Sequence, residues 1–184
     1  MADIDWSDPE KSIEGIKKLI KAVPDFPKKG ILFRDIMGIF QVPQAVQAMV
    51  DIMSYHIQQK HPECDAIVGL DARGFLMAPM IAIKLNVPFI PVRKQGKLPG
   101  ECISAESVKE YGKDVLEMQK GCLKEGQKVV IVDDLLATGG TMATTCSLVR
   151  QFGCSVSGTI CLVELAELNG VKKLDAPFHA MIKY

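Results

Sequence analysis

Apolar and polar residues along the chain follow two periods, one typical of helices and one typical of buried strands. In the first 60 residues, apolar residues recur every three or four positions, which is the spacing of amphipathic helices. Ser7-Asp8-Pro9 can cap and start a first helix, which we expect to end before Pro24, and a second helical segment begins at Pro43. The expected apolar faces are Ile13, Ile16, Leu19 and Ile20 in the first helix, and Val46, Met49, Val50, Met53 and Ile57 in the second.

A turn-rich link and a short extended piece separate these two helices. The link, residues 24–30, reads PDFPKKG, and the extended piece is Ile31-Leu32-Phe33. From residue 64 onward, continuous apolar runs alternate with helical patterns. The expected strands are 64–70, 88–93, 128–132, 155–163 and 177–184, and the expected helices are 74–85 and 140–152. Because crossover helices cover both faces of a parallel sheet, this alternation predicts an α/β fold with an open parallel sheet flanked by helices.

One long segment does not fit this alternation. Residues 93–114 read RKQGKLPGECISAESVKEYGKD, are rich in charge and glycine, and have no clear period. We therefore expect an irregular, flexible loop. Loops of this length inside a compact domain are uncommon and are usually functional lids or disordered segments. A lid is the interpretation we favour, and an idle surface excursion is the alternative.

Length and charge narrow the class of protein. A chain of 184 residues with 48% apolar content can fill one core, so we expect a single domain over 1–184. Lys and Arg number 22, and Asp and Glu also number 22, so no overall field favours nucleic acid or an anionic membrane as a partner. Any anion must be bound locally.

Cell location can be estimated from two further features. The first residues, MADIDWSDPEKS, are polar and acidic, unlike a signal peptide, and the most apolar stretch, 75–92, is interrupted by prolines and polar residues. We expect a soluble, cytoplasmic protein. The six cysteines include no CxxC pair and have no histidine at ligand spacing, so free thiols are expected rather than disulfides or a metal site.

The most informative stretch is 129–141, which reads VVIVDDLLATGGT. An apolar strand runs into Asp133 and Asp134, and a loop of Ala, Thr and Gly then leads into a helix. Ligands of open α/β sheets collect at the carboxyl ends of the strands. Glycines let successive N–H groups converge on one anion, and the start of the helix adds its positive dipole. The loop is therefore a candidate phosphate cradle.

The two carboxylates cannot bind the same phosphate, because like charges repel. They can accept hydrogen bonds from sugar hydroxyls or orient water on a divalent cation. Phosphate, diol and metal together describe a ribose 5-phosphate. No Lys follows the glycines, so this is not a Walker loop, and the dinucleotide pattern GxGxxG is also absent. Exposed Asp residues and capping glycines would explain each position alone, but they explain the ordered run poorly.

This stretch resembles the phosphoribosyl pyrophosphate (PRPP) binding motif of type I phosphoribosyltransferases, and its Leu135-Leu136-Ala137 form resembles the adenine-specific branch of that family. Further stretches match the branch in the same order over roughly residues 20–184. They are PDFPKKGILFRDI (24–36), GLDARGF (69–75), RKQGKLPG (93–100), EYGK (110–113) and LVEL (162–165). Residues 104–109, SAESVK, lack the Ser-Tyr that family members commonly place shortly before the Glu.

The resemblance implies a PRPP site made of three parts. Ala137, Thr138, Gly139, Gly140 and Thr141 would hold the 5-phosphate, and Asp133 and Asp134 would bind the ribose 2- and 3-hydroxyls. Asp71, Ala72, Arg73, Arg93 and Lys97 would bind pyrophosphate, the last two partly across the interface of a homodimer. In the family, the loop that contains Asp71 and Ala72 often has a strained or cis peptide bond. Magnesium would be held through substrate and water, with no direct protein ligand.

The resemblance also implies adenine recognition and a reaction. Ile31, Leu32, Phe33 and Arg34, in a small N-terminal hood of about residues 1–40, would contact adenine together with Leu135. Main-chain groups near Leu32 would pair with N1 and the 6-amino group. The expected reaction converts adenine and PRPP to AMP and pyrophosphate in purine salvage. Arg73 would be catalytic, Glu110 would be the acid or base near the imidazole ring, and Tyr111 would belong to the closing lid.

Two other functions remain open from the sequence. The enzyme could use another purine base with the same donor, or the chain could be a non-catalytic regulator that senses PRPP. The zero net charge and the lack of an extra helical region weigh against a DNA-binding regulator. His56, His61 and His179 are isolated in the sequence, and we expect structural or solvent roles for them.

Overall fold

The computed structural model describes residues 4–108 and 113–184, and it divides into two compact units. The first ends at Met53 and the second is Ser54–Tyr184. The first unit contains helix α1 (Pro9–Leu19), strands β1 (Lys21–Pro24) and β2 (Leu32–Asp35), and the short 3-10 helix η1 (Ile39–Gln41). Helix α2 (Pro43–Lys60) spans the division between the units.

The expected first helix is confirmed, and its start follows from local chemistry. Asp8 caps α1 by accepting hydrogen bonds from the main-chain N–H groups of Glu10 and Lys11, and Pro9 occupies the first turn. After α1, β1 and β2 form an antiparallel hairpin in which Pro24 lies opposite Leu32. The extended piece at 31–33 is thus largely confirmed as β2, whereas β1 was not predicted. All four residues of β1 are exposed, so its sequence KAVP does not alternate between apolar and polar residues as a half-buried strand would.

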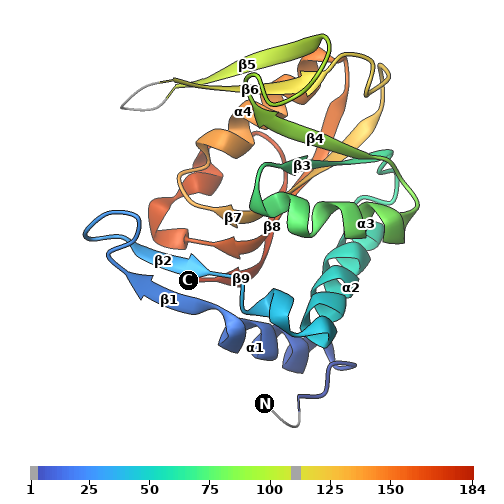
Figure 1. Cartoon of the computed structure of the whole chain (residues 1–184). Coiled ribbons are helices and arrows are strands. Elements are labelled where there is room, and N and C mark those ends of the chain that lie inside the picture. The colour runs from blue at the N-terminus through green and yellow to red at the C-terminus, as the bar shows by residue number, and fades with distance from the viewer. Residues whose placement is uncertain (1–3, 109–112) are drawn as a thin grey trace. The chain divides into compact units, whose positions relative to one another are not determined.

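The second unit is built on a seven-stranded sheet with the strand order β5-β6-β4-β3-β7-β8-β9 (Figure 1). Strands β4, β3, β7, β8 and β9 run parallel, and β5 and β6 form an antiparallel hairpin paired to β4. This confirms the predicted α/β class with a mostly parallel sheet. The strands are β3 (Ala66–Leu70), β4 (Phe89–Lys94), β5 (Cys102–Val108), β6 (Lys113–Gln119), β7 (Lys128–Leu136), β8 (Ser155–Glu164) and β9 (Phe178–Lys183).

Helices complete the second unit. They are α3 (Ala78–Leu85) and α4 (Gly140–Gln151), with 3-10 helices η2 (Arg73–Leu76), η3 (Ala166–Leu168) and η4 (Gly170–Lys173). The connection β3-α3-β4 steps one way along the sheet and β7-α4-β8 steps the other way. Because such crossovers are right-handed, α3 and α4 cover opposite faces. The predicted helix at 74–85 is divided in the structure. Its first residues belong to the 3-10 helix η2, and the α-helix α3 begins at Ala78.

The expectation of an irregular loop over residues 93–114 is wrong for residues 102–108. Residues 102–108 form β5, which pairs along its whole length with β6, from Cys102 opposite Gln119 to Val108 opposite Lys113. Main-chain hydrogen bonds join the two strands, and alternate residues Ile103 and Ala105 of β5 pack against the core cluster. Glu110 and Tyr111, which we expect in the lid, lie outside the residues that the structure describes.

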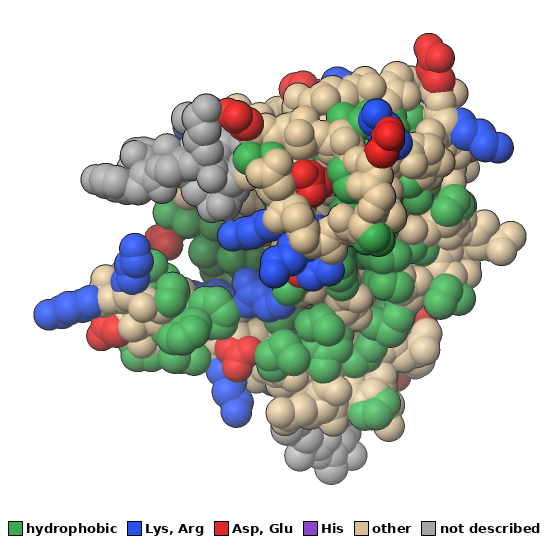
Figure 2. All heavy atoms as spheres, turned by 45° about the horizontal axis from the view of Figure 1, so that its top comes forward, with side chains coloured by type: hydrophobic (Ala, Val, Ile, Leu, Met, Phe, Trp, Pro, Cys, Tyr) green, Lys and Arg blue, Asp and Glu red, His purple; other side chains and the backbone are tan. Residues whose placement is uncertain are grey.

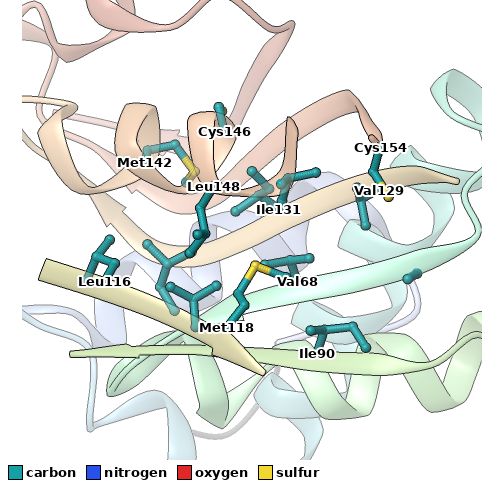
Figure 3. Packing of buried hydrophobic residues seen from close by; sticks show 14 of the residues in the cluster. Val68, Ile90, Leu116, Met118, Val129, Ile131, Met142, Cys146, Leu148 and Cys154 are labelled. Atoms are coloured by element: carbon teal, nitrogen blue, oxygen red, sulfur yellow. The ribbon is translucent and has the colours of Figure 1, made fainter. Parts of the chain in front are cut away.

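The main core of the second unit lies between the sheet and α4 (Figure 3). Alternate residues of the central strands, such as Val68 in β3 and Val129 and Ile131 in β7, belong to this cluster. It also contains Ile90, Leu116, Met118, Met142, Cys146, Leu148 and Cys154. A fixed core under the ends of β3 and β7 gives the residues that follow these strands a rigid base.

Candidate active site

The candidate site lies where the strand order reverses direction. Strands β3 and β7 are parallel neighbours, with Gly69 opposite Val132 in the register. Their following helices leave toward opposite sides of the sheet, which makes the carboxyl edge of this pair a topological switch point. Residues 71–74 follow β3, and residues 133–141 cover the end of β7 and the start of α4. Both predicted PRPP-binding segments therefore lie on the edge where α/β folds bind ligands.

The loop between β7 and α4 has the geometry of an anion-binding turn. Gly139 adopts a left-handed conformation with φ of 77° and caps the 12-residue helix α4 without a side-chain hydrogen bond. The main-chain N–H groups of the first turn thus face no side-chain cap. A cavity of about 100 Å³ lies against this turn. Its lining residues are Asp133, Leu135, Leu136, Ala137, Thr138, Gly139, Gly140, Thr141 and Met142.

Two adjacent carboxylates stand at the entrance to this loop in different surroundings. Asp134 is 5% exposed, whereas Asp133 is half-buried and lines the cavity. The N–H of Asp134 donates a 2.9 Å hydrogen bond to Oδ1 of Asp133. Burial, followed by the charge of Asp134, raises the pKa of Asp133 well above its ordinary value. An electropositive ligand or a hydroxyl donor would relieve this repulsion.

An ion pair links the loop after β3 to the acidic pair. Nε of Arg73 lies 2.9 Å from Oδ2 of Asp134, although the contact is outside hydrogen-bonding geometry. Burial raises the pKa of Asp134, and the Arg73 charge opposes that rise. The Arg73 side chain keeps 30% of its surface exposed. It can therefore contact both the acidic pair and a ligand at the edge of the sheet.

The loop after β3 is also tied to β4. The peptide bond between Asp71 and Ala72 is cis, as the resemblance implied for this loop. Oδ2 of Asp71 accepts a 3.0 Å hydrogen bond from Nε of Arg93, and Nη1 of Arg93 donates to the carbonyl of Lys97 at 3.1 Å. The structure thus brings Asp71, Arg93 and the main chain of Lys97 together. Lys and Arg side chains gather near the middle of the face shown in Figure 2.

Comparison with known proteins identifies the family. The phosphoribosyl transferase domain matches residues 38–182. Adenine phosphoribosyltransferase from Drosophila pseudoobscura is 47% identical over 95% of this chain and 97% of its own, and the Caenorhabditis elegans enzyme is 48% identical over 92% of each. The chain belongs to the adenine phosphoribosyltransferase family. It is therefore an enzyme of phosphoribosyl transfer.

Solved structures of adenine phosphoribosyltransferases share the fold. The Saccharomyces cerevisiae enzyme, in complex with adenine and an imino-altritol bisphosphate, superimposes with a TM-score of 0.91 at 42% identity, over 94% of this chain and 99% of its own. The Thermoanaerobacter pseudethanolicus enzyme gives 0.90 at 44% identity, over 94% and 99%. This confirms the predicted type I phosphoribosyltransferase-like fold.

The residues expected to contact adenine fall in both units of the chain. Ile31 and Leu32 are 44% and 47% exposed, and Phe33 and Arg34 continue along β2 of the first unit. The Phe33 ring packs edge-on against Phe26, with ring centroids 5.0 Å apart. Leu135 is half-buried and lines the cavity in the second unit. Exposed apolar side chains are suited to contact a flat heterocycle.

Sequence reasoning did not single out two glycines of the site. A Cβ at Gly74 would lie 2.9 Å from Oδ1 of Asp133 and 3.1 Å from the carbonyl of Val132, so a glycine here lets the loop after β3 approach the acidic pair closely. Gly170 makes a similar contact with the loop after β7. No pattern in the sequence indicates the role of Gly170, because its partners Ala137 and Gly139 lie in a distant part of the chain.

Proposed function

We propose that the chain converts adenine and PRPP to AMP and pyrophosphate at the carboxyl edge of β3 and β7. The observation that carries this proposal is the cavity whose lining includes both the glycine-rich start of α4 and Asp133. A cradle of N–H groups beside a carboxylate matches a phosphate on a sugar that also presents hydroxyls. This is the chemistry of the ribose 5-phosphate part of PRPP.

The 5-phosphate binds to the main chain of Ala137, Thr138, Gly139, Gly140 and Thr141. The left-handed Gly139 turns this loop into the helix start, where the dipole of α4 favours negative charge. The ribose 2- and 3-hydroxyls donate to Asp133 and Asp134. Hydrogen bonds from a diol stabilise the charged carboxylates and offset the burial that raises their pKa values.

Pyrophosphate binds where Asp71, Ala72, Arg73, Arg93 and Lys97 gather. Arg93 is held by Asp71 and by the Lys97 carbonyl, which orients its guanidinium without consuming all of its donors. Lys97 is exposed and can reach a charged ligand. Arg73 lies next to the acidic pair and contributes positive charge between the pyrophosphate and the base.

Magnesium fits this donor set through water and substrate oxygens. Hard divalent cations prefer carboxylate and phosphate oxygens, and Asp133 and Asp134 supply carboxylates near the ribose. Within residues 4–108 and 113–184, no group of three or more His, Cys, Asp or Glu side chains is placed to hold a metal ion. When bound to pyrophosphate and ribose oxygens, magnesium would supply positive charge that neutralises the leaving group.

Adenine binds through Ile31, Leu32, Phe33, Arg34 and Leu135. The main chain near Leu32 reads the base, because a carbonyl accepts from the 6-amino group but would face an oxygen in hypoxanthine or guanine. A buried acceptor without a donor costs about 1–3 kcal/mol. Pro24, which lies opposite Leu32, has no N–H to donate to β2, and this supports an available acceptor.

The reaction is a substitution at the anomeric carbon. The bond from adenine N9 to this carbon forms, the bond to pyrophosphate oxygen breaks, and pyrophosphate leaves with the electron pair. Arg73, Arg93 and Lys97 stabilise the negative charge that builds on the leaving group. Glu110 accepts or relays the proton of the imidazole ring, and Tyr111 belongs to the lid that excludes water.

The assembly and location extend this proposal. We place the enzyme in the cytoplasm as a homodimer, with Arg93 and Lys97 near the interface between the copies. No helix in the described part of the chain is both long and apolar enough to cross a membrane.

Chromatography of purified protein incubated with PRPP, magnesium and one of several bases tests the proposal. AMP and pyrophosphate should form from adenine, and an excess of hypoxanthine, guanine or xanthine should compete weakly. A nucleotide formed preferentially from another base would replace the substrate assignment. PRPP binding with no nucleotide from any base would instead favour a PRPP-sensing regulator.

A further inference from the structure

The phosphate loop rests on the main chain of another segment. A Cβ at Gly139 would collide with the carbonyl oxygen of Gly170, and a Cβ at Gly170 would collide with the carbonyl oxygen of Ala137. The Cβ at Gly170 would also lie 2.9 Å from the nitrogen of Gly139. The two turns therefore meet backbone to backbone, and the contact leaves no space for a side chain on either partner.

The two glycines are needed for different reasons. Gly139 has a φ of 77°, so a side chain there would be strained whatever the space. Gly170 is not in the left-handed region, which means that an alanine could adopt its backbone conformation. The only penalty for a side chain at Gly170 is the collision with Ala137 and Gly139.

Two main-chain hydrogen bonds anchor the segment that precedes Gly170. The N–H of Leu165 donates to the carbonyl of Leu136 at 2.9 Å, directly before the phosphate loop. The N–H of Ala166 donates to the carbonyl of Tyr184 at 2.9 Å, which ties the segment to the end of β9. Asn169 then turns the chain in a left-handed conformation with φ of 52° and ψ of 30°, and η4 begins at Gly170. The segment that leads to Gly170 is thus anchored at its start to the strand that precedes the cradle.

We infer that Gly170 is a positioning residue for the 5-phosphate cradle. It rests on the proposed phosphate site, because it acts through the Ala137 carbonyl and the Gly139 N–H of that loop. Because Gly170 has no side chain, the loop can pack directly on its main chain. This contact fixes the position of the loop and orients the Gly139 N–H toward the ligand. The contact is specific for the phosphorylated end of the substrates, so PRPP, AMP and ribose 5-phosphate depend on it, and adenine and pyrophosphate do not.

The test compares AMP with adenosine, which lacks only the phosphate. The ratio of the adenosine Kd to the AMP Kd, measured by calorimetry, isolates the contribution of the phosphate. In Gly170→Ala this ratio should fall at least tenfold, and the KM for PRPP should rise by a similar factor while the Kd of pyrophosphate stays within twofold. Gly121→Ala is the control, because Gly121 has a φ of 76° and open space around it. It should lower the Tm without changing the ratio.

The outcomes separate the inference from the proposed function. A wild-type protein that binds AMP and adenosine equally would contradict the phosphate site itself. A wild type that prefers AMP, together with Gly170→Ala that keeps the same ratio, would overturn the inference alone. If Gly170→Ala does not fold, Asn169→Val disturbs the left-handed turn without filling the contact. The ratio of the adenosine Kd to the AMP Kd must then be lower in Asn169→Val than in wild type and close to the wild-type value in Asn169→Gly. A wild-type ratio in both variants would overturn the role of Gly170.

Discussion

Arg73 and Asp134 form an ion pair across the switch point of the sheet, with Nε of Arg73 2.9 Å from Oδ2 of Asp134. One partner follows β3 and the other is in β7, so the pair joins the two loops that are proposed to bind opposite ends of PRPP. Asp134 is nearly buried, and burial alone would favour its neutral form. Arg73 therefore has two roles, as a counter-charge for Asp134 and as a cation for the substrate.

Replacing Arg73 should separate these two roles. In Arg73→Gln the buried Asp134 loses its cation, and the free energy of unfolding at pH 7 should fall by about 1–3 kcal/mol. In the double variant Arg73→Gln with Asp134→Asn, much of this stability should return, because the uncompensated charge is gone. Activity should remain low in both, since the substrate still lacks its cation. Urea unfolding and AMP formation measure the two effects.

The surface ion pair of Arg150 and Asp175 supplies the control for this experiment. Its atoms also lie 2.9 Å apart, but its side chains are 39% and 67% exposed. Arg150→Gln should change the free energy of unfolding by less than about 1 kcal/mol and leave the activity intact. Equal losses of stability in the two single variants would show that Asp134 does not depend on Arg73.

Asp133 should contribute to donor affinity rather than to base affinity. Asp133→Asn keeps the shape but weakens the acceptor for a ribose hydroxyl, a loss of about 1.5–3 kcal/mol for a hydrogen bond to a charged group. The KM for PRPP should rise by roughly 10- to 100-fold, with little change in the KM for adenine. Steady-state kinetics with each substrate varied in turn measures this. The exposed Asp175→Asn should leave both values unchanged, and a selective rise in the KM for adenine would refute the assignment.

Glu110 should act on the chemical step. Proton transfer by a placed carboxyl group contributes typically 10²–10⁴-fold, so Glu110→Ala should lower kcat by about that range while the Kd of PRPP stays nearly unchanged. Glu106, an exposed residue of β5, provides a control of the same type four positions earlier. Glu106→Ala should keep kcat within about threefold of wild type on the same reasoning. Similar losses of kcat in both variants would point to lid closure instead of a proton transfer by Glu110.

The three histidines give the second unit a pH-dependent stability. The rings of His56 and His179 stack with centroids 3.7 Å apart, and burial, then the neighbouring charges of His179 and His61, lowers the pKa of His56 to about 4. Below pH 6.5 the unfolded chain protonates His56 while the folded chain does not, so stability present above pH 6.5 is lost as the pH falls toward 4. Between pH 7 and pH 5 the loss should be about 1–2 kcal/mol.

Urea unfolding at both pH values tests this expectation against His56→Gln. The glutamine variant has no imidazole at position 56 and should lose correspondingly less stability between pH 7 and pH 5. A wild type and a variant with parallel pH profiles would show that His56 titrates alike in both states. The histidines are isolated only in the sequence, since the ring centroids of His56 and His61 also lie 6.2 Å apart. Nothing in the sequence links His179 to residues more than a hundred positions earlier.

The parts predicted well from the sequence are those where local chemistry and the fold agree. The apolar and mostly β-branched run 129–132 favours a buried strand, and a glycine pair before a helical pattern indicates the loop that follows. The β5–β6 hairpin was missed because its pairing depends on β4 and on a distant partner strand, and the alternation of Ile103 and Ala105 in β5 is too short to stand out among charged residues and glycines. Gly170 was missed because a close contact between two backbones requires knowledge of both positions.

Amide chemical shifts of the β7–α4 loop test the central claim most directly. In ¹H–¹⁵N spectra of the labelled protein titrated with ribose 5-phosphate, the N–H signals of Thr138, Gly139, Gly140 and Thr141 should shift most, and ribose without the phosphate should leave them nearly unchanged. Saturation of these shifts with a single Kd would establish the cradle. Unmoved signals at these four amides, with binding detected elsewhere in the protein, would contradict it.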